Sequence, residues 1–150
     1  LTADDGDART YLDIALAASI PPYQTWLHEH QLFTHPLSAE MEDADHDGLL
    51  NILEYAMNLP GNIPGGNPVS YDWAEVDGEQ YLRISVPKNP DAANMRLEAQ
   101  ATDDPGSLPS WTGDGLIIEA DTPTLLRVRD YVPLSQGGRR FMRVRVWMAP

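Results

Sequence analysis

Three aspartates recur at every second position of one short segment, and a glycine and a glutamate follow them. Residues 43–54 read Asp-Ala-Asp-His-Asp-Gly-Leu-Leu-Asn-Ile-Leu-Glu. Aspartates at this spacing can turn their carboxylates to the inside of a tightly coiled loop, and Gly48 allows a sharp turn that a residue with a Cβ makes less easily. Glu54 can reach back from the first turns of a following helix. The segment therefore predicts an acidic loop that leads into a helix.

This is the full spacing of a calcium-binding loop. Hard oxygen ligands at high coordination number favour Ca²⁺ over Zn²⁺, and a flexible loop favours it over Mg²⁺. We expect a structural role for the ion, because carboxylates crowded into one loop repel one another without a cation. Leu50 is expected to point into the core. The predicted ligands are Asp43, Asp45, Asp47, Leu49 through its carbonyl, Asn51 directly or through a water, and Glu54.

A segment rich in Pro and Gly, residues 59–68, separates two compositions. Residues 1–68 carry a net charge of −10 and residues 69–150 a net charge of −3, within a total of −13. Because such a segment neither continues a helix nor enters a central strand, we place a linker there. The predicted parts are an N-terminal extension (1–22), a helical calcium-loop segment (23–60), a linker (61–68) and a β-sandwich-like domain (69–150).

Hydrophobic periodicity differs between the two halves. The first half has the spacing of short helices at residues 11–19, 23–33 and 50–58. The second half alternates: residues 71–76 and 81–86 face each other across Asp77-Gly78, a hairpin signal. Further strands are expected at residues 95–101, 116–119, 125–132 and 140–148. The fold class predicted is α+β, with a short helical part packed on a small antiparallel β-sandwich.

Composition excludes several classes of function. A net charge of −13 argues against general binding to the nucleic-acid backbone, and no apolar run is long enough to span a membrane. The chain has no cysteine, so it has no disulfide and no thiolate ligand or nucleophile. No nucleophile elbow or phosphate-binding loop occurs, and the four histidines lack the spacing of a zinc site. We expect no catalysis by this chain, although a parent polypeptide or complex can be an enzyme.

Arginines alternate with apolar residues in two of the predicted strands. If these strands are neighbours, four guanidiniums share one sheet face. Three interpretations stay open: a surface for an anionic polysaccharide or a partner, a solvated face with Arg–acid pairs that include Asp130 and Glu98, or a surface on which the acidic first half docks. Tryptophans at strand ends and turns can stack on sugars or close a core. The candidate ligand surface comprises Arg127, Arg129, Arg143, Arg145, Trp73, Trp111 and Trp147.

Four segments carry a resemblance to a known type of module. They are Tyr23-Gln-Thr-Trp-Leu27, the loop from Asp43 to Ala56, Ser110-Trp-Thr-Gly113 and Arg139-Arg-Phe-Met-Arg-Val-Arg145. Together they resemble C-terminal modules of large exported bacterial proteins, which join a thrombospondin-type-3-like or EF-hand-type calcium loop to a small β-domain. Dockerins use a similar loop but carry it twice, whereas this chain has one copy.

The resemblance implies a secreted or cell-surface, non-catalytic accessory module that is stabilised by calcium. Its partner would be the remainder of a larger polypeptide or another chain, and its role would be positioning, attachment or assembly. The alternative is a carbohydrate-binding module that recognises polysaccharide through the arginine and aromatic face.

Overall fold

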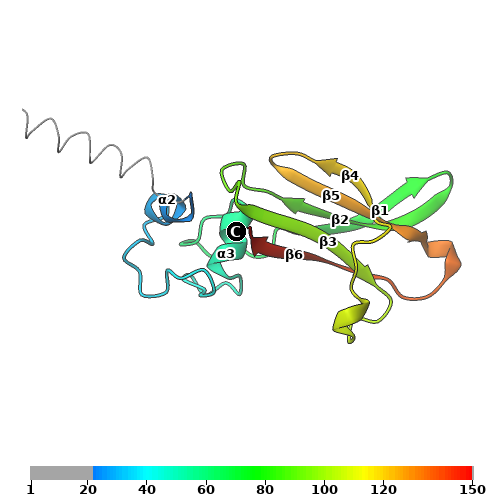
Figure 1. Cartoon of the computed structure of the whole chain (residues 1–150), viewed down its shortest axis with the longest axis horizontal. Coiled ribbons are helices and arrows are strands. Elements are labelled where there is room, and N and C mark those ends of the chain that lie inside the picture. The colour runs from blue at the N-terminus through cyan, green and yellow to red at the C-terminus, as the bar shows by residue number, and fades with distance from the viewer. Residues whose placement is uncertain (1–21, 150) are drawn as a thin grey trace, which may run out of the picture.

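Two α-helices and six strands follow one another along residues 22–149, the part of the chain that the computed structural model describes (Figure 1). The predicted helix at 11–19 and nearly all of the predicted extension at 1–22 lie outside the described residues. The elements are α2 (Pro22–Glu29), α3 (Asn51–Ala56), β1 (Ser70–Val76), β2 (Glu79–Pro87), β3 (Met95–Thr102), β4 (Ile117–Asp121), β5 (Leu125–Pro133) and β6 (Phe141–Met148), with 3₁₀ turns η1 (Leu108–Ser110) and η2 (Leu134–Gln136).

Helix α2 buries its apolar face and ends earlier than the predicted residue 33. Tyr23, Trp26 and Leu27 are buried. The helix ends because Gln31 adopts a left-handed conformation with φ 59°, and the Leu32 amide donates to the Leu27 carbonyl at 2.7 Å. These features are typical of a Schellman cap, which satisfies helix carbonyls that would otherwise lack partners.

Helix α3 ends in the same way, inside the predicted range 50–58. Asn58 has φ 61°, and the Leu59 amide donates to the Glu54 carbonyl at 2.8 Å. Ala56 and Met57 are buried on the predicted apolar side. Leu50 is only partly buried, and it belongs to neither core cluster. Leu50 is the N-cap residue of α3, and the prediction that it points into the core is not confirmed.

The hairpin of β1 and β2 forms as predicted. Val76 pairs with Glu79 across Asp77 and Gly78, whose φ values of 52° and 81° are both positive. Positive φ at both central residues is the geometry of a type I′ turn, which matches the twist of the two strands. Local turn chemistry therefore determines this pairing.

The six strands form two antiparallel sheets. One has the order β1-β2-β5-β4 and the other consists of β3 and β6 (Figure 1). The strands predicted from alternation are confirmed within a few residues at each end. The structure is mostly antiparallel sheet with two short helices, so the coarse α+β class is confirmed.

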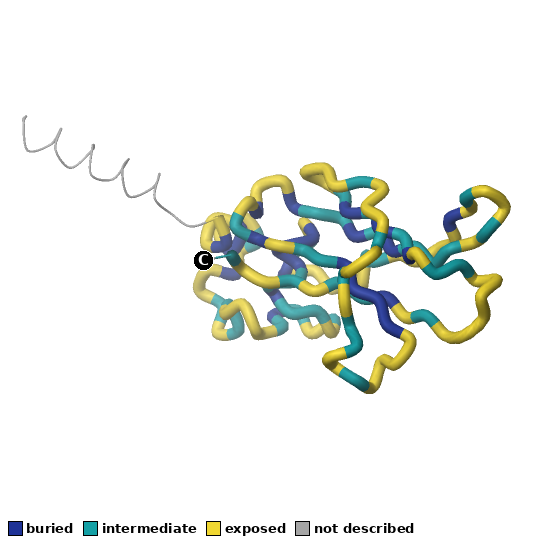
Figure 2. The backbone as a smooth tube through the Cα atoms, turned by 45° about the vertical axis from the view of Figure 1, so that its right-hand side comes forward, coloured by how far each residue is buried: buried dark blue, intermediate teal, exposed yellow. Residues whose placement is uncertain are grey.

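Two hydrophobic clusters fill the interior. The first joins both helices to the start of β3 through Trp26, Tyr55 and Met95. The second lies between the two sheets around Ile84, Val86 and Met142, and it also contains Met57 from the end of α3 (Figure 2). The helical part and the sheets therefore share core contacts across the predicted linker.

Candidate metal site

The structure brings the three loop aspartates together. Asp43, Asp45 and Asp47 each offer a carboxylate oxygen, and these oxygens all lie within 4.8 Å of one another. His46 and Gly48, which alternate with them, have positive φ values of 62° and 96°. Left-handed residues inside the loop coil it tightly, so successive aspartates face the same side.

Backbone amides of the loop orient these carboxylates. Asp43 accepts hydrogen bonds from the amides of His46, at 2.7 Å, and Gly48, at 3.0 Å. Asp45 accepts from the Asp47 amide at 3.2 Å, and Asp47 from the Leu49 amide at 2.8 Å. Short-range bonds of this kind are the usual reason that Asp occurs in turns. These bonds from neighbouring backbone amides orient the three carboxylates.

Glu54, in the first turn of α3, is a buried carboxylate whose pKa the three loop aspartates influence. Only 1% of its surface is exposed, and its Oε2 atom has no hydrogen-bond partner among the described residues. The Oδ2 atom of Asp45 is buried and lacks a partner in the same way. A buried carboxylate oxygen without a partner is costly, and a cation is one means of compensating it. The three aspartates could hold a metal ion, and coordination by Glu54 stays a prediction.

Electrostatics in the loop agree with this geometry. Burial, reinforced by the negative charges of Asp45, Asp47 and Asp43, raises the pKa of Glu54 from 4.5 to about 8. Burial also raises the pKa of Asp45, with further contributions from Asp47 and Asp43. Both carboxyls are therefore poorly stabilised as anions, and a divalent cation would reverse this.

Asp47 differs because it is held by the linker. Its Oδ2 atom accepts hydrogen bonds from the amides of Gly65, at 2.9 Å, and Gly66, at 3.0 Å. These two bonds, together with the one from the Leu49 amide, lower the pKa of Asp47. The linker therefore wraps back onto the acidic loop. Sequence reasoning missed this contact, since nothing in the Pro- and Gly-rich composition indicates which loop it touches.

Asn51 serves the architecture of the loop. It is fully buried, and its side-chain amide donates to the carbonyls of Leu37, at 2.8 Å, and Ala39, at 2.9 Å. Its Oδ1 atom accepts from the Ala44 amide at 3.2 Å. The side chain thus closes residues 37–44 against the start of α3. Coordination by Asn51 and by the Leu49 carbonyl stays a prediction.

The histidines have other surroundings. His28 stacks on Phe33 at 3.8 Å between ring centres, His30 lies 5.1 Å from Trp26, and the Nδ1 atom of His35 accepts from the Leu37 amide. Within residues 22–149 the group of potential metal ligands is the aspartate group. No helix in this part of the chain is both long and apolar enough to cross a membrane.

The candidate ligand surface is divided between two sheets. Arg127 and Arg129 lie on β5, in the four-stranded sheet, whereas Arg143 and Arg145 lie on β6, in the two-stranded sheet. The condition for one face of four guanidiniums is therefore not met, because the strands that carry them are not neighbours. Asp130, considered as a partner of these arginines, pairs instead with Arg140.

The tryptophans of this surface are also separated. Trp73 is 52% exposed on β1 and lines a cavity of about 150 Å³ with Leu82, Leu134 and residues 137–138. Trp111 and Trp147 lie beside Arg143 and Arg145, with the guanidinium carbons 4.4 Å and 5.1 Å from the ring centres. Only these last four residues form one continuous arrangement.

Comparisons of this chain with protein-family models, with curated proteins and with solved structures found no match.

Proposed function

We propose that this chain is a calcium-stabilised, non-catalytic accessory module of a larger exported bacterial protein. The observation that carries the proposal is the buried Glu54 carboxylate, whose Oε2 atom lacks a partner beside three gathered aspartates. Four carboxylates from one loop and one helix are a donor set suited to a hard cation. We interpret the loop and α3 as half of an EF-hand-like unit, and the two sheets as a small β-sandwich.

In this proposal calcium joins the loop to α3 and hence to the core. Asp43, Asp45 and Asp47 would bind from the loop and Glu54 from the helix, and the ion would offset their mutual repulsion. Binding to the folded state alone stabilises a protein by about 2.7 kcal/mol at a free ligand concentration of roughly 100 times Kd. For a small domain this is a large share of the free energy of unfolding.

The accessory role rests on the resemblance to calcium-loop modules of exported proteins. Its support in the structure is the position of the acidic loop at one end of the sheets, where a bound ion would stiffen the junction between the helices and β3. Such a module would position, attach or assemble a larger polypeptide at the cell surface or outside the cell.

The test is a calorimetric calcium titration of protein freed of metal by EDTA, with melting curves recorded in parallel. We expect one saturable site, a higher Tm with calcium, and a much weaker response to magnesium. Glu54→Gln should abolish both the heat and the rise in Tm. Glu75→Gln, the same change at an exposed residue of β1, is the matched control and should leave both intact. A flat titration, or equal responses from the two variants, would overturn the proposal.

A further inference from the structure

The outward face of the two-stranded sheet carries a row of arginines and tryptophans. The other face packs into the core through residues such as Ala99, Ala101 and Met142. Side chains alternate along a strand, so the outward face of β6 carries Arg143, Arg145 and Trp147. Arg96 lies on β3 directly opposite Trp147, and Trp111 reaches the same face from the loop after η1.

Each guanidinium of β6 is paired with an aromatic ring. The carbon of the Arg143 guanidinium lies 4.4 Å from the centre of the Trp111 ring, and that of Arg145 lies 5.1 Å from the centre of the Trp147 ring. Cation–π contacts orient a guanidinium without neutralising its charge. N–H groups that have no other acceptor stay available for a carboxylate or a sulfate.

No acidic side chain in residues 22–149 forms an ion pair with these arginines. Arg143 donates from Nε and Nη2 to the neutral Gln100, at 3.0 Å and 2.9 Å. Glu98 on β3 pairs with Arg145 on β6, but the Glu98 carboxylate lies against Gly113. A Cβ placed on Gly113 would lie 2.7 Å from the Oε1 atom of Glu98. The face thus keeps its positive charge on a chain whose net charge is −13.

The outward face of the four-stranded sheet is different. There Glu119 forms ion pairs with both Arg83, at 3.2 Å, and Arg129, at 3.5 Å, and Asp72 forms a second pair with Arg83. The charge of an arginine that is already paired with a carboxylate is largely neutralised, so such an arginine attracts an anionic ligand only weakly. Arg127 of this sheet donates to Ser85 and has no ion pair among the described residues, but it is a single arginine beside two that are already paired. The face of β3 and β6 instead carries several arginines without an ion pair among the described residues.

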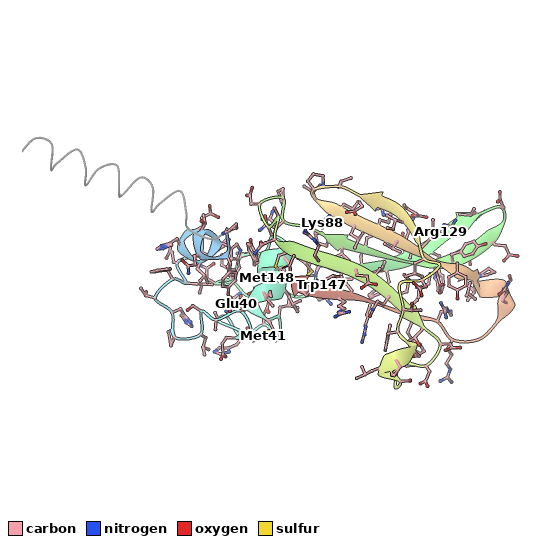
Figure 3. The ribbon with its side chains drawn as sticks, viewed as in Figure 1. Glu40, Met41, Lys88, Arg129, Trp147 and Met148 are labelled. Atoms are coloured by element: carbon pink, nitrogen blue, oxygen red, sulfur yellow. The ribbon has the colours of Figure 1, made fainter. Side chains whose placement is uncertain are left out.

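We propose that this face binds a linear anionic polysaccharide, with carboxylate or sulfate groups held by Arg143, Arg145 and Arg96, and sugar rings stacked on the tryptophans. Trp147 is 37% exposed and lies at the end of β6 nearest α3 (Figure 3). From there the row extends along β6 to Arg143 for about 14 Å, at roughly 3.4 Å per residue. This length accommodates several sugar residues of an extended chain. The binding function goes beyond the structural role proposed for calcium.

The test is calorimetric titration, at low salt and with the calcium-treated protein, of three hexasaccharides: an oligogalacturonate, a heparin fragment and the neutral maltohexaose. We expect binding of at least one anionic hexasaccharide, weakening as salt is added, and no binding of maltohexaose. Arg145→Gln should weaken the binding about tenfold or more, since a charge-assisted hydrogen bond is lost. The matched control is Arg127→Gln on the other sheet, which also removes an arginine without an ion pair among the described residues and should leave affinity unchanged.

Several outcomes would overturn the proposal. They are no binding of either anionic hexasaccharide, equal losses from the two arginine variants, or tighter binding of hexaglutamate, which would indicate an acidic protein partner. Melting curves of both variants establish that they are folded. Because the calcium titration has its own variant, Glu54→Gln, failure of the metal site and failure of the glycan site give separate results.

Discussion

The Tyr55 hydroxyl donates a hydrogen bond to the Oδ1 atom of Asn94 at 3.0 Å, across 39 positions of the sequence. Tyr55 directly follows the candidate ligand Glu54, and Asn94 directly precedes β3. The carbonyl of Asn94 also accepts from the Ala149 amide, at 2.7 Å, just beyond β6. One residue therefore joins the helix of the acidic loop to both strands of the two-stranded sheet.

Removal of this hydroxyl should destabilise the protein. We expect Tyr55→Phe to lower the free energy of unfolding by about 1–2 kcal/mol, because the buried Tyr55 side chain loses its hydrogen bond and the half-buried Asn94 side chain loses a partner. Urea denaturation measures the change. Tyr71→Phe removes a hydroxyl from a half-exposed tyrosine that donates to the Met142 carbonyl at 3.3 Å, and it should cost less. Equal losses of unfolding free energy would show that the Tyr55–Asn94 hydrogen bond stabilises the protein no more than the bond of the exposed Tyr71.

Stability of the metal-free protein should fall as the pH rises. The pKa of Glu54 is about 8 in the folded state, against an ordinary value of 4.5. Between these values the folded state holds a proton that the unfolded state has released, so the stabilisation is complete below about 4.5 and is lost as the pH passes about 8. Calcium should remove this loss by taking the place of the proton, and its effect on Tm should grow with pH.

The measurement is a series of denaturant midpoints from pH 5 to pH 8 in metal-depleted buffer. Glu54→Gln has no proton to lose at this position, so its stability relative to the native chain should increase steadily with pH. A constant difference between the two proteins would contradict the assigned surroundings of Glu54.

An ion pair with a buried carboxylate joins Asp130 of β5 to Arg140, the residue that precedes β6. Asp130 is fully buried, and it accepts hydrogen bonds from Arg140 at 2.6 Å and 2.9 Å. Arg140→Met should lower the free energy of unfolding by about 3 kcal/mol, since a buried carboxylate is left without its cation. Denaturation of Asp72→Asn, which breaks an exposed pair with Arg83, is the comparison and should show a loss below about 1 kcal/mol. Similar losses would contradict the role given to burial.

Gly61 is predicted to resist substitution because its neighbours leave no room for a side chain. A Cβ there would lie 2.3 Å from the Trp26 ring and 2.9 Å from the Leu32 side chain. Gly61→Ala should cost about 1–3 kcal/mol, because buried side chains would have to move. Gly65→Ala meets only an ordinary contact at 3.9 Å and should be close to neutral. Thermal melting compares the two, and a neutral Gly61→Ala would show that Trp26 is less tightly held than its packing indicates.

Local features were predictable from the sequence because they depend on neighbouring residues. The alternation of Asp43, Asp45 and Asp47 around left-handed positions gathers their carboxylates through bonds to nearby amides. The Asp77-Gly78 turn pairs β1 with β2 by its own conformation. The periodicity of the strands likewise indicated which residues face inward. The end of α2 was less predictable, since Gln31 is not a residue that commonly adopts the left-handed conformation.

Only the tertiary structure decided which distant segments meet. The sequence placed arginines on two strands, but the pairing of β5 with β2 and β4, and of β6 with β3, separated them onto two sheets. The tertiary structure also placed Glu98 beside Gly113 and left Arg145 without an acidic partner among residues 22–149. The spacing of the loop predicted a ligand role for Glu54, whereas the burial of this side chain is seen only in the tertiary structure. Such contacts depend on the packing of segments far apart in the chain, which local propensity and spacing do not determine.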